Sequence, residues 1–108
     1  MITITPCVFC QIAKDLNAPI VDIEPLNPVV PGHIIVFSKD HSKDFADNPN
    51  ITKDVVEYAS KLAKRLGGDW NLITSKGASA TQTVFHLHVH LVPRKPNDGI
   101  ILPWTFQI

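Results

Sequence analysis

The longest periodic segment of the chain, Ile51–Leu66, has the spacing of an amphipathic helix. Apolar residues recur there every three or four positions, which places them on one face of a helix. Asn50 precedes the segment as a suitable N-cap, and Gly67 with Gly68 marks its end. The residues of the apolar face are Val55, Val56, Ala59, Leu62, Ala63 and Leu66. The pattern therefore predicts one long helix that packs on other elements through this face.

Short runs of β-branched and apolar residues predict the strands. His33–Ser38 has the composition of a strand that is buried on both faces, and Trp70–Ser75 predicts a second strand. Thr83–Pro93 predicts the longest strand. Asn17–Gly32 is rich in proline, so we expect extended, turn-rich backbone there and no helix. Strands around one long helix indicate a single α+β domain over residues 1–108 with a largely antiparallel sheet.

Composition and charge exclude several classes of protein. A chain of 108 residues can bury a core as one domain without disulfides. It carries ten basic and ten acidic residues, so we expect neither a nucleic acid nor a membrane surface as partner. No apolar run has the length of a membrane span, and the first residues, MITITPCVFC, lack the features of a signal peptide. We therefore expect a cytoplasmic protein.

The chain has two cysteines, Cys7 and Cys10, which are too few for the disulfide framework of a secreted fold. In a reducing compartment such a pair binds a metal or carries out redox chemistry. A redox pair normally begins a helix that follows a strand, so we favour metal binding.

Three of the five histidines alternate with aliphatic residues in the segment HLHVHLV, His86–Val92. Successive side chains of a strand point to opposite faces, so the three rings share one face at intervals of about 6 to 7 Å. The other face consists of Phe85, Leu87, Val89 and Leu91, and we expect it to pack on the helix. Three titratable rings in a row gain no packing that valine would not supply, so they indicate chemistry.

Two kinds of chemistry suit these rings. A His-x-His pair on a strand can bind zinc from one side. Alternatively, a neutral imidazole can attack phosphorus and be displaced again by water. Rings at strand spacing do not easily converge on one tetrahedral ion, so the geometry favours a division of labour between the three histidines.

These motifs resemble the histidine triad (HIT) superfamily of nucleotide hydrolases and transferases, whose signature is His-x-His-x-His followed by two apolar residues. His86–Val92 fits this signature in full. The match extends to a Cys-x-Phe-Cys-x-Ile start at Cys7–Ile12, to Asn27–His41 and to Thr81–Lys95, in the family's order. The resemblance implies a HIT-like α+β fold with one long helix and a mainly antiparallel sheet of about five strands, which continues into a partner's sheet in a homodimer.

The resemblance implies a separate role for each residue of the site. His88, the middle histidine, is the nucleophile that attacks the α-phosphorus and forms a transient nucleotidyl-histidine, which water hydrolyses. His90 contacts the phosphate or its leaving group, and His33 supports the site. Gln82 and Thr83 match a polar pair that donates hydrogen bonds to the phosphate oxygens.

The resemblance also implies a structural zinc ion of the kind that bacterial members carry. Its ligands in the family are two cysteines, a histidine that ends the middle motif and the first triad histidine, which correspond to Cys7, Cys10, His41 and His86. Two thiolates and two imidazoles form a closed tetrahedral set, which is typical of structural zinc. The first triad histidine then belongs to the metal, and we expect no organic cofactor.

Several apolar residues match the nucleoside pocket of the family. They are Val8, Phe9, Ile12, Ile23 and Leu26, and plain core packing is the alternative for each. The family's ribose-binding aspartate corresponds to Pro25, which has no side-chain acceptor. Glu24 is the candidate to replace it from the preceding position.

Other positions also differ from the family's pattern. Ser75 stands where asparagine is common and Thr81 where glycine is common, although both hydroxyls can bind phosphate. The segment after Ile12 is short and lacks a hairpin. Trp104 lies in an apolar C-terminal run and matches a tryptophan near the family's active site, sometimes from the partner subunit. Such a run favours a homodimer.

The sequence therefore predicts a nucleotide hydrolase or nucleotidyl transferase that acts at an α-phosphate through His88. The expected substrate is a nucleoside phosphoramidate or a dinucleoside polyphosphate. A nucleotide-binding or regulatory module with little or no turnover is the alternative, because Pro25, Ser75 and the missing hairpin alter the pocket. A pure metal-binding protein would require all three imidazoles to converge on one ion.

Overall fold

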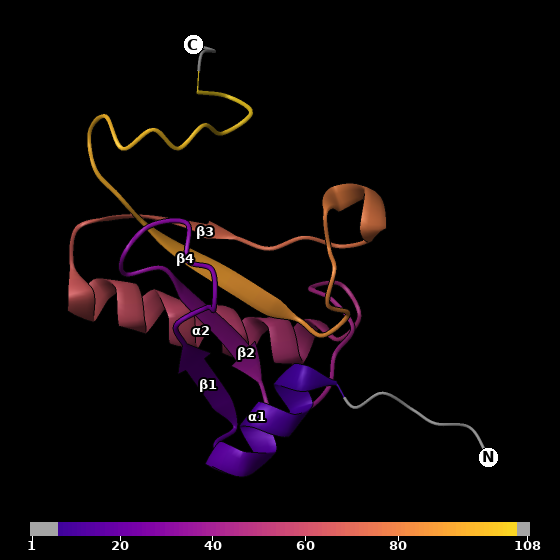
Figure 1. Ribbon diagram of the computed structural model, residues 1–108. Helices are drawn as coiled ribbons and strands as arrows, with labels where there is room; N and C mark the ends of the chain where they lie inside the picture. Colours follow the sequence, from indigo (N-terminus) through magenta and orange to yellow (C-terminus); the bar gives the residue numbers. More distant parts are fainter. Residues whose placement is uncertain (1–6, 106–108) are drawn as a thin grey trace.

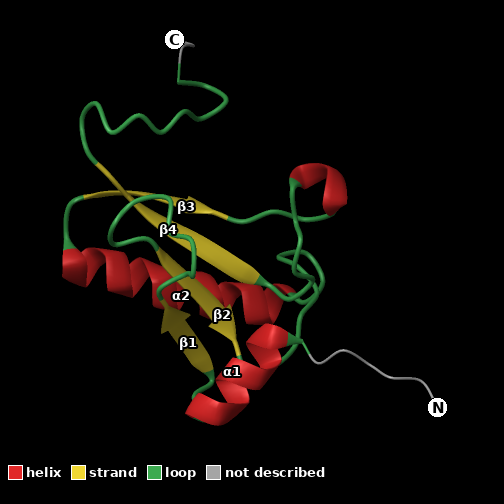
Figure 2. Ribbon diagram, in the orientation of Figure 1, coloured by secondary structure: helices red, strands yellow, loops and turns green. Residues whose placement is uncertain are grey.

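The computed structural model describes residues 7–105 and contains a four-stranded antiparallel sheet with helices on both faces (Figure 1). The strands lie in the order β1, β2, β4, β3, and they span Ile20–Ile23 (β1), Ile34–Ser38 (β2), Asp69–Ile73 (β3) and His88–Arg94 (β4). Helix α1 spans Val8–Leu16, helix α2 spans Pro49–Leu66, and a 3-10 turn covers Ala78–Ala80 (Figure 2). The α+β class and the antiparallel sheet are confirmed, with four strands where about five were expected.

Helix α2 is the predicted long helix, but it begins earlier than the apolar spacing suggests. The side chain of Asn48 accepts hydrogen bonds from the N–H groups of Asn50 and Ile51, at 3.1 and 3.4 Å. Pro49 is the first helical residue, a position that proline favours because its missing N–H would have no partner there. The N-cap is therefore Asn48, and the prediction of Asn50 was wrong.

The buried face of α2 packs on one face of the sheet. Its buried residues are Val55, Ala59 and Leu62, and they contact Val36, Leu87, Val89 and Leu91. Val56 and Leu66 belong to the predicted apolar face, yet they are 37% and 50% exposed. The buried face of α2 is thus narrower than the spacing of apolar residues in the sequence predicts. Glu57 and Lys61 form an ion pair of 3.2 Å on the solvent side.

Helix α1 is an element that the sequence analysis does not predict. Cys7 caps its start by accepting a hydrogen bond from the Cys10 N–H at 3.4 Å, and Asn17 ends it in the left-handed conformation with φ of 51°. Phe9 and Ala13 are buried against the face of the sheet opposite α2, together with Val21, Ile35 and Phe37. This packing fixes the N-terminal cysteines beside the sheet.

Strand β4 begins at His88, five residues later than predicted, because the preceding backbone turns out of the sheet. The N–H of Leu87 donates to the Ser42 carbonyl at 2.6 Å, in the loop after β2. Phe85, which was expected on the face packed against the helix, is instead 43% exposed, with the Lys43 ammonium 5.7 Å from its ring centroid. Leu87, by contrast, does reach the core.

The segment between α1 and β2 contributes a single strand, β1, in agreement with the expected lack of a hairpin. This strand pairs with β2 and forms one edge of the sheet, while β3 forms the other edge. Among residues 7–105, neither helix has the length and the apolar character needed to cross a membrane.

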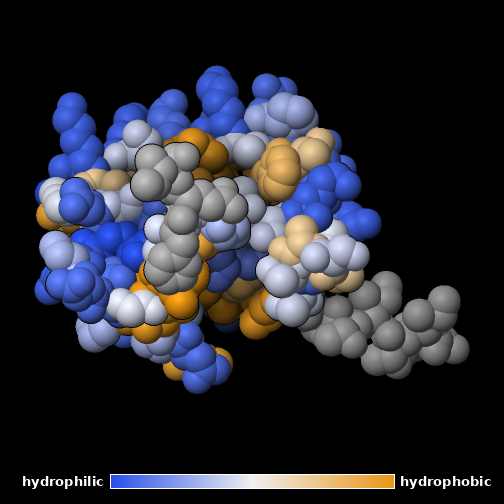
Figure 3. Space-filling view, turned by 90° about the horizontal axis from the view of Figure 1, so that it is seen from above, coloured by the Kyte–Doolittle hydropathy of each residue, from blue (hydrophilic) through white to orange (hydrophobic). Residues whose placement is uncertain are grey.

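The C-terminal residues leave the sheet at an ion pair. Arg94 donates to both carboxylate oxygens of Asp98, at 2.7 and 3.0 Å, and this hydrogen bonding holds the pKa of Asp98 well below its usual range. Beyond this turn, Ile101 and Trp104 are 68% and 61% exposed. The view from this end of the molecule shows apolar side chains gathered near the middle of the face and hydrophilic ones at its margin (Figure 3).

Truncation of Leu91, which is 1% exposed between α2 and the sheet, should lower the free energy of unfolding. We expect Leu91→Ala to cost about 2 to 5 kcal/mol, because it leaves a cavity that the sheet cannot close. Leu16→Ala is the control, since Leu16 is 58% exposed, and it should cost under about 1 kcal/mol. Urea unfolding followed by circular dichroism measures both, and equal losses would contradict the assignment of the core.

Candidate active site and metal centre

Four side chains of metal-binding types converge between α1, the loop after β2 and the segment before β4. They are Cys7, Cys10, His41 and His86, whose sulfur and nitrogen atoms lie within 4.8 Å of one another. His86 Nδ1 is 3.2 Å from Cys7 Sγ, and 3.3 Å from Cys10 Sγ. His41 Nδ1 is 3.1 Å from His86 Nδ1. Ligand atoms of tetrahedral zinc lie about 3.3 to 3.8 Å apart, so this spacing is close to that of a metal-ligand set.

The chemistry of the four donors also fits a metal ion. His86 Nε2 donates to the Ser38 carbonyl at 2.7 Å, so the neutral ring directs an unprotonated Nδ1 at the two sulfurs. Burial lowers the pKa of His86, which favours this neutral form. Burial and the adjacent Cys7 raise the pKa of Cys10 to about 11, because two neighbouring thiolates repel each other when no cation lies between them. A divalent cation relieves that repulsion.

The backbone of the same histidine orients the middle ring of the triad. His88 Nδ1 lies 2.7 Å from the His86 carbonyl oxygen. Only a protonated nitrogen can donate to this oxygen, so the neutral His88 ring carries its lone pair on Nε2. The Phe9 ring lies against His88, with the ring centroids 4.9 Å apart. His88 is thus fixed in one tautomer, with the unprotonated nitrogen directed away from its own backbone.

A second chain of hydrogen bonds fixes the third ring. The Val29 N–H donates to His33 Nδ1 at 3.1 Å, so the proton of the neutral His33 ring is on Nε2. That nitrogen lies 2.9 Å from His90 Nδ1, which therefore accepts and leaves the His90 proton on Nε2. Burial and the neighbouring His88 and His33 lower the pKa of His90 to about 4. His90 is consequently a neutral hydrogen-bond donor near pH 7.

The rings of His88 and His90 line a small cavity of about 110 Å³. The other residues around it are Ile73, Ser75, Thr81 and Gln82. A water molecule in the liquid occupies about 30 Å³, so the cavity has room for a phosphate group but not for a nucleoside. It joins two histidines with hydroxyl-bearing residues from the loop after β3.

Gln82 lines this cavity, yet its side chain is already fully engaged. Its Nε2 donates to the carbonyls of Lys43 and Val84, at 2.8 and 3.2 Å, and its Oε1 accepts from the Gly77 N–H at 2.8 Å. Both amide protons of Gln82 are therefore already donated, and neither is free for the expected hydrogen bond to a phosphate. The side chain instead ties the segment before β4 to the loop of His41 and Lys43. Thr83, the other expected donor, is exposed and does not line the cavity.

Thr81 has a backbone conformation that threonine rarely adopts. Its φ is 71°, in the left-handed region where a β-branched side chain is strained. Its hydroxyl donates to the Ala80 carbonyl at 2.5 Å. Glycine, the residue common at this position among the proteins that the chain resembles, would adopt the same φ without strain.

The residues expected around a nucleoside are spread over several surfaces. Phe9 is buried, and Ile12 and Ile23 pack on the same cluster, which is the one nearest to His88. Val8 is 51% exposed and Leu26 is 100% exposed. Phe9, Ile12 and Ile23 all pack in this core cluster.

Glu24 and Trp104 do not line the cavity around His88. Glu24, the residue after β1, lines a cavity with His33, Leu66 and Trp70 that is separate from the one around His88 and His90. The replacement of the ribose acceptor by Glu24 stays a prediction. Trp104 lies in the exposed tail and lines none of the cavity around His88.

The sequence analysis missed four groups of this site. Phe37 pairs with His88 across β2 and β4, and Ile73 pairs with His90 across β3 and β4. The Ser38 carbonyl and the Val29 N–H fix two histidine tautomers. The positions of Phe37 and Ile73 beside the histidines depend on strand register, which the sequence does not give. The hydrogen bonds of backbone groups depend on the fold and have no signature in a sequence.

Comparisons with known proteins agree with this fold and site. A family model described as HIT domain matches residues 13–97. An adenosine 5'-monophosphoramidase of Saccharomyces cerevisiae is 30% identical over 112 residues, with 94% of this chain and 71% of that protein covered. The chain has the three alternating histidines of histidine triad proteins, and two of them, His88 and His90, line the small cavity. The chain belongs to the HIT domain family.

Two solved structures have the same fold. A HIT family hydrolase from Clostridium thermocellum superposes with a TM-score of 0.73 and 33% identity, covering 93% of this chain and 100% of that one. A zinc-bound histidine triad family protein from Mycobacterium smegmatis has a TM-score of 0.76 and 30% identity, covering 89% of this chain and 80% of that one.

The four-residue centre predicts one metal ion per chain. Cys10→Ser should lose the ion, because serine does not provide a thiolate. His90→Ala is the matched control and should keep it, since His90 contacts His33 and not the centre. Elemental analysis of the purified variants measures the ratio of metal to protein. Loss of metal in His90→Ala, with retention in Cys10→Ser, would mean that the roles are reversed.

Proposed function

We propose that this chain cleaves a nucleotide at its α-phosphate, with His88 as the nucleophile. The single observation that carries the proposal is the hydrogen bond of 2.7 Å from His88 Nδ1 to the His86 carbonyl, because it leaves the Nε2 lone pair free to attack. The phosphoramidase activity of the yeast relative supports a nucleotide hydrolase in general. The substrate that we propose is a nucleoside phosphoramidate or a dinucleoside polyphosphate, with hydrolysis or transfer as the outcome.

The proposed reaction has two displacements at phosphorus. In the first, the His88 Nε2 lone pair forms a bond to the α-phosphorus, and the leaving group departs with its bonding electron pair and takes a proton from solvent. In the second, water attacks the phosphorus of the nucleotidyl-histidine, the phosphorus–nitrogen bond breaks, and its electron pair returns to Nε2. The attacking water releases a proton to solvent.

His90 and the cavity support this reaction by hydrogen bonding. The His90 Nε2 proton is available because Nδ1 accepts from His33 at 2.9 Å. A fixed neutral donor stabilises negative charge that develops on the phosphate or the leaving group, and it avoids the cost of burying a cation. Ser75 adds a hydroxyl at the same cavity, whereas the Thr81 hydroxyl proton is already donated to the Ala80 carbonyl.

The metal that we propose for Cys7, Cys10, His41 and His86 is zinc in a structural role. When bound, it would supply a fixed tetrahedral anchor and no chemistry at the substrate. The zinc-bound relative from Mycobacterium smegmatis supports this choice of metal. These residues hold α1, the loop after β2 and the segment before β4 together, so they position the phosphate cavity indirectly.

The proposed assembly is a homodimer of single-domain chains. Leu72 and Ile73 of the edge strand β3 are 41% and 37% exposed, and Ile101 and Trp104 are also exposed. Apolar residues in these positions favour burial against a second copy, whose sheet would continue this one. The cytoplasmic location stays a prediction.

A nucleotide-binding or regulatory role with little or no turnover is the second candidate. Pro25 offers no side-chain acceptor for a ribose, and Glu24 lines a cavity separate from that of His88. Thr81 also strains the loop beside the cavity. These features weaken binding at the sugar but leave His88 and His90 in place.

An adduct of the intact chain tests the proposed intermediate. Incubation with an adenosine phosphoramidate or a diadenosine polyphosphate, followed by a quench in base, should add the mass of one nucleotidyl group, and His88→Ala should abolish the addition. Thr83→Ala is the control, because Thr83 lies outside the cavity, and it should form the adduct normally. Tight nucleotide binding with neither adduct nor product would favour the binding module.

A further inference from the structure

Among residues 7–105, β1 is an edge strand, and no other strand pairs with its outer side. The Lys39 N–H donates to the Pro19 carbonyl at 2.8 Å, which identifies Pro19 and Lys39 as a hydrogen-bonded pair of the β1–β2 ladder. In an antiparallel ladder such pairs alternate with non-bonded pairs. The N–H and C=O groups of Ile20 and Asp22, which pair with Ser38 and Val36, therefore point away from β2.

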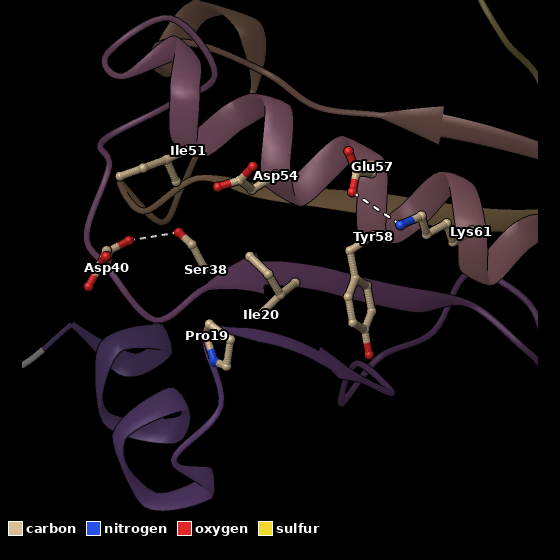
Figure 4. A pocket seen from close by; sticks show the side chains of 9 residues that line it. All are labelled: Pro19, Ile20, Ser38, Asp40, Ile51, Asp54, Glu57, Tyr58 and Lys61. Atoms are coloured by element: carbon tan, nitrogen blue, oxygen red, sulfur yellow. Dashed lines mark hydrogen bonds and ion pairs between the residues drawn. The ribbon is translucent and has the colours of Figure 1, made fainter.

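A cavity of about 340 Å³ lies between this edge and α2, on the face of the sheet opposite His88 (Figure 4). Its wall combines apolar side chains with carboxylates. The apolar residues are Pro19, Ile20, Ile51 and Tyr58, the acidic ones are Asp40, Asp54 and Glu57, and Ser38 and one basic residue, Lys61, complete the wall. The α2 residues among them recur at three- and four-residue intervals, so they form one stripe of the helix above the edge strand.

The edge strand is held rigidly in this position. The Tyr58 hydroxyl of α2 donates to the Asp22 carboxylate of β1, and this hydrogen bond raises the pKa of Tyr58. The other side of β1 is paired with β2 over all four of its residues. A strand that is fixed in its bonding geometry loses little conformational entropy when another chain pairs with it.

The charged side chains beside this edge determine which kind of polypeptide segment can bind there. Within residues 7–105, the carboxylate of Glu57 has an ion-pair partner in Lys61, at 3.2 Å, while no ion pair involves Asp40 or Asp54. A second copy of this chain would bring the two acidic stripes and the two Asp22 residues toward each other, which is unfavourable. Basic side chains on an added strand would instead meet opposite charge.

We infer that the outer edge of β1 binds an extended segment of a partner protein with basic residues at alternate positions. The segment adds a fifth strand to the sheet by pairing with the outward groups of Ile20 and Asp22, about 4.8 Å from β1. Its basic side chains lie under α2, toward Asp54 and Asp40. This inference is independent of the nucleotide chemistry, because it concerns the opposite face of the sheet.

A capped hexapeptide of alternating valine and lysine is a suitable probe, since valine favours strands and lysine matches the acidic stripe. Nuclear magnetic resonance of the labelled protein should show slower hydrogen exchange for the amides of Ile20 and Asp22 when the peptide is added. The amides of Val21 and Ile23 already bond to β2, so their exchange should change little. A peptide of alternating valine and glutamate should leave all four unchanged.

Two matched charge-reversal variants distinguish peptide binding at the edge of β1 from nonspecific electrostatic attraction. Asp54→Lys should weaken binding of the valine–lysine peptide about three- to tenfold, as expected for replacing one attractive charge by a repulsive one. Asp69→Lys changes the net charge equally at the start of the other edge strand, β3, and should leave the affinity unchanged. Both residues are exposed, so both variants should fold.

Several results would overturn the inference. Protection of Val21 and Ile23 in place of Ile20 and Asp22 would mean that no strand is added. Equal weakening by Asp54→Lys and Asp69→Lys would mean that the peptide binds through net charge alone. Protection of Ile20 and Asp22 that rises with protein concentration in the absence of peptide would identify a second copy as the occupant.

Discussion

The site depends on His86, because one residue joins the metal centre to the nucleophile. Its ring donates to the Ser38 carbonyl and directs Nδ1 at two cysteines, while its own carbonyl fixes the tautomer of His88. The segment that carries it has left the sheet and is held by bonds to the loop after β2, including the one from Gln82 to the Lys43 carbonyl. A displacement of His86 would therefore disturb both the metal centre and the orientation of His88.

Much of this arrangement follows from residue spacing. Alternation along β4 separates a core face, which includes Leu91, from a histidine face, and the structure has both. Three rings at strand spacing do not easily converge on one ion, and in the structure His86 faces the cysteines, while His88 and His90 face the cavity. The long helix is predictable for the same reason, since its buried residues recur with the helical period.

The remainder could not be predicted because it depends on tertiary hydrogen bonds and on register. Gln82 has the chemistry of a phosphate donor, but three backbone groups already occupy its amide. Glu24 is adjacent to the expected position in sequence, but in the structure it lines a different cavity from His88 and His90. Helix α1 was missed because its apolar residues were interpreted as ligand contacts, and its cap is a cysteine, which is not a typical N-cap.

The tautomer of His88 with and without metal tests the central claim most directly. Long-range proton–nitrogen correlation spectra of the labelled protein report which ring nitrogen carries the proton. In the metal-loaded protein, His88 should be protonated at Nδ1 alone, and removal of the metal by a chelator should turn this signal into an average of both tautomers. The signals of the His33–His90 pair should persist, which shows that the fold is retained. A His88 signal that stays unchanged after metal loss, or a proton on Nε2 in the loaded protein, would contradict the account.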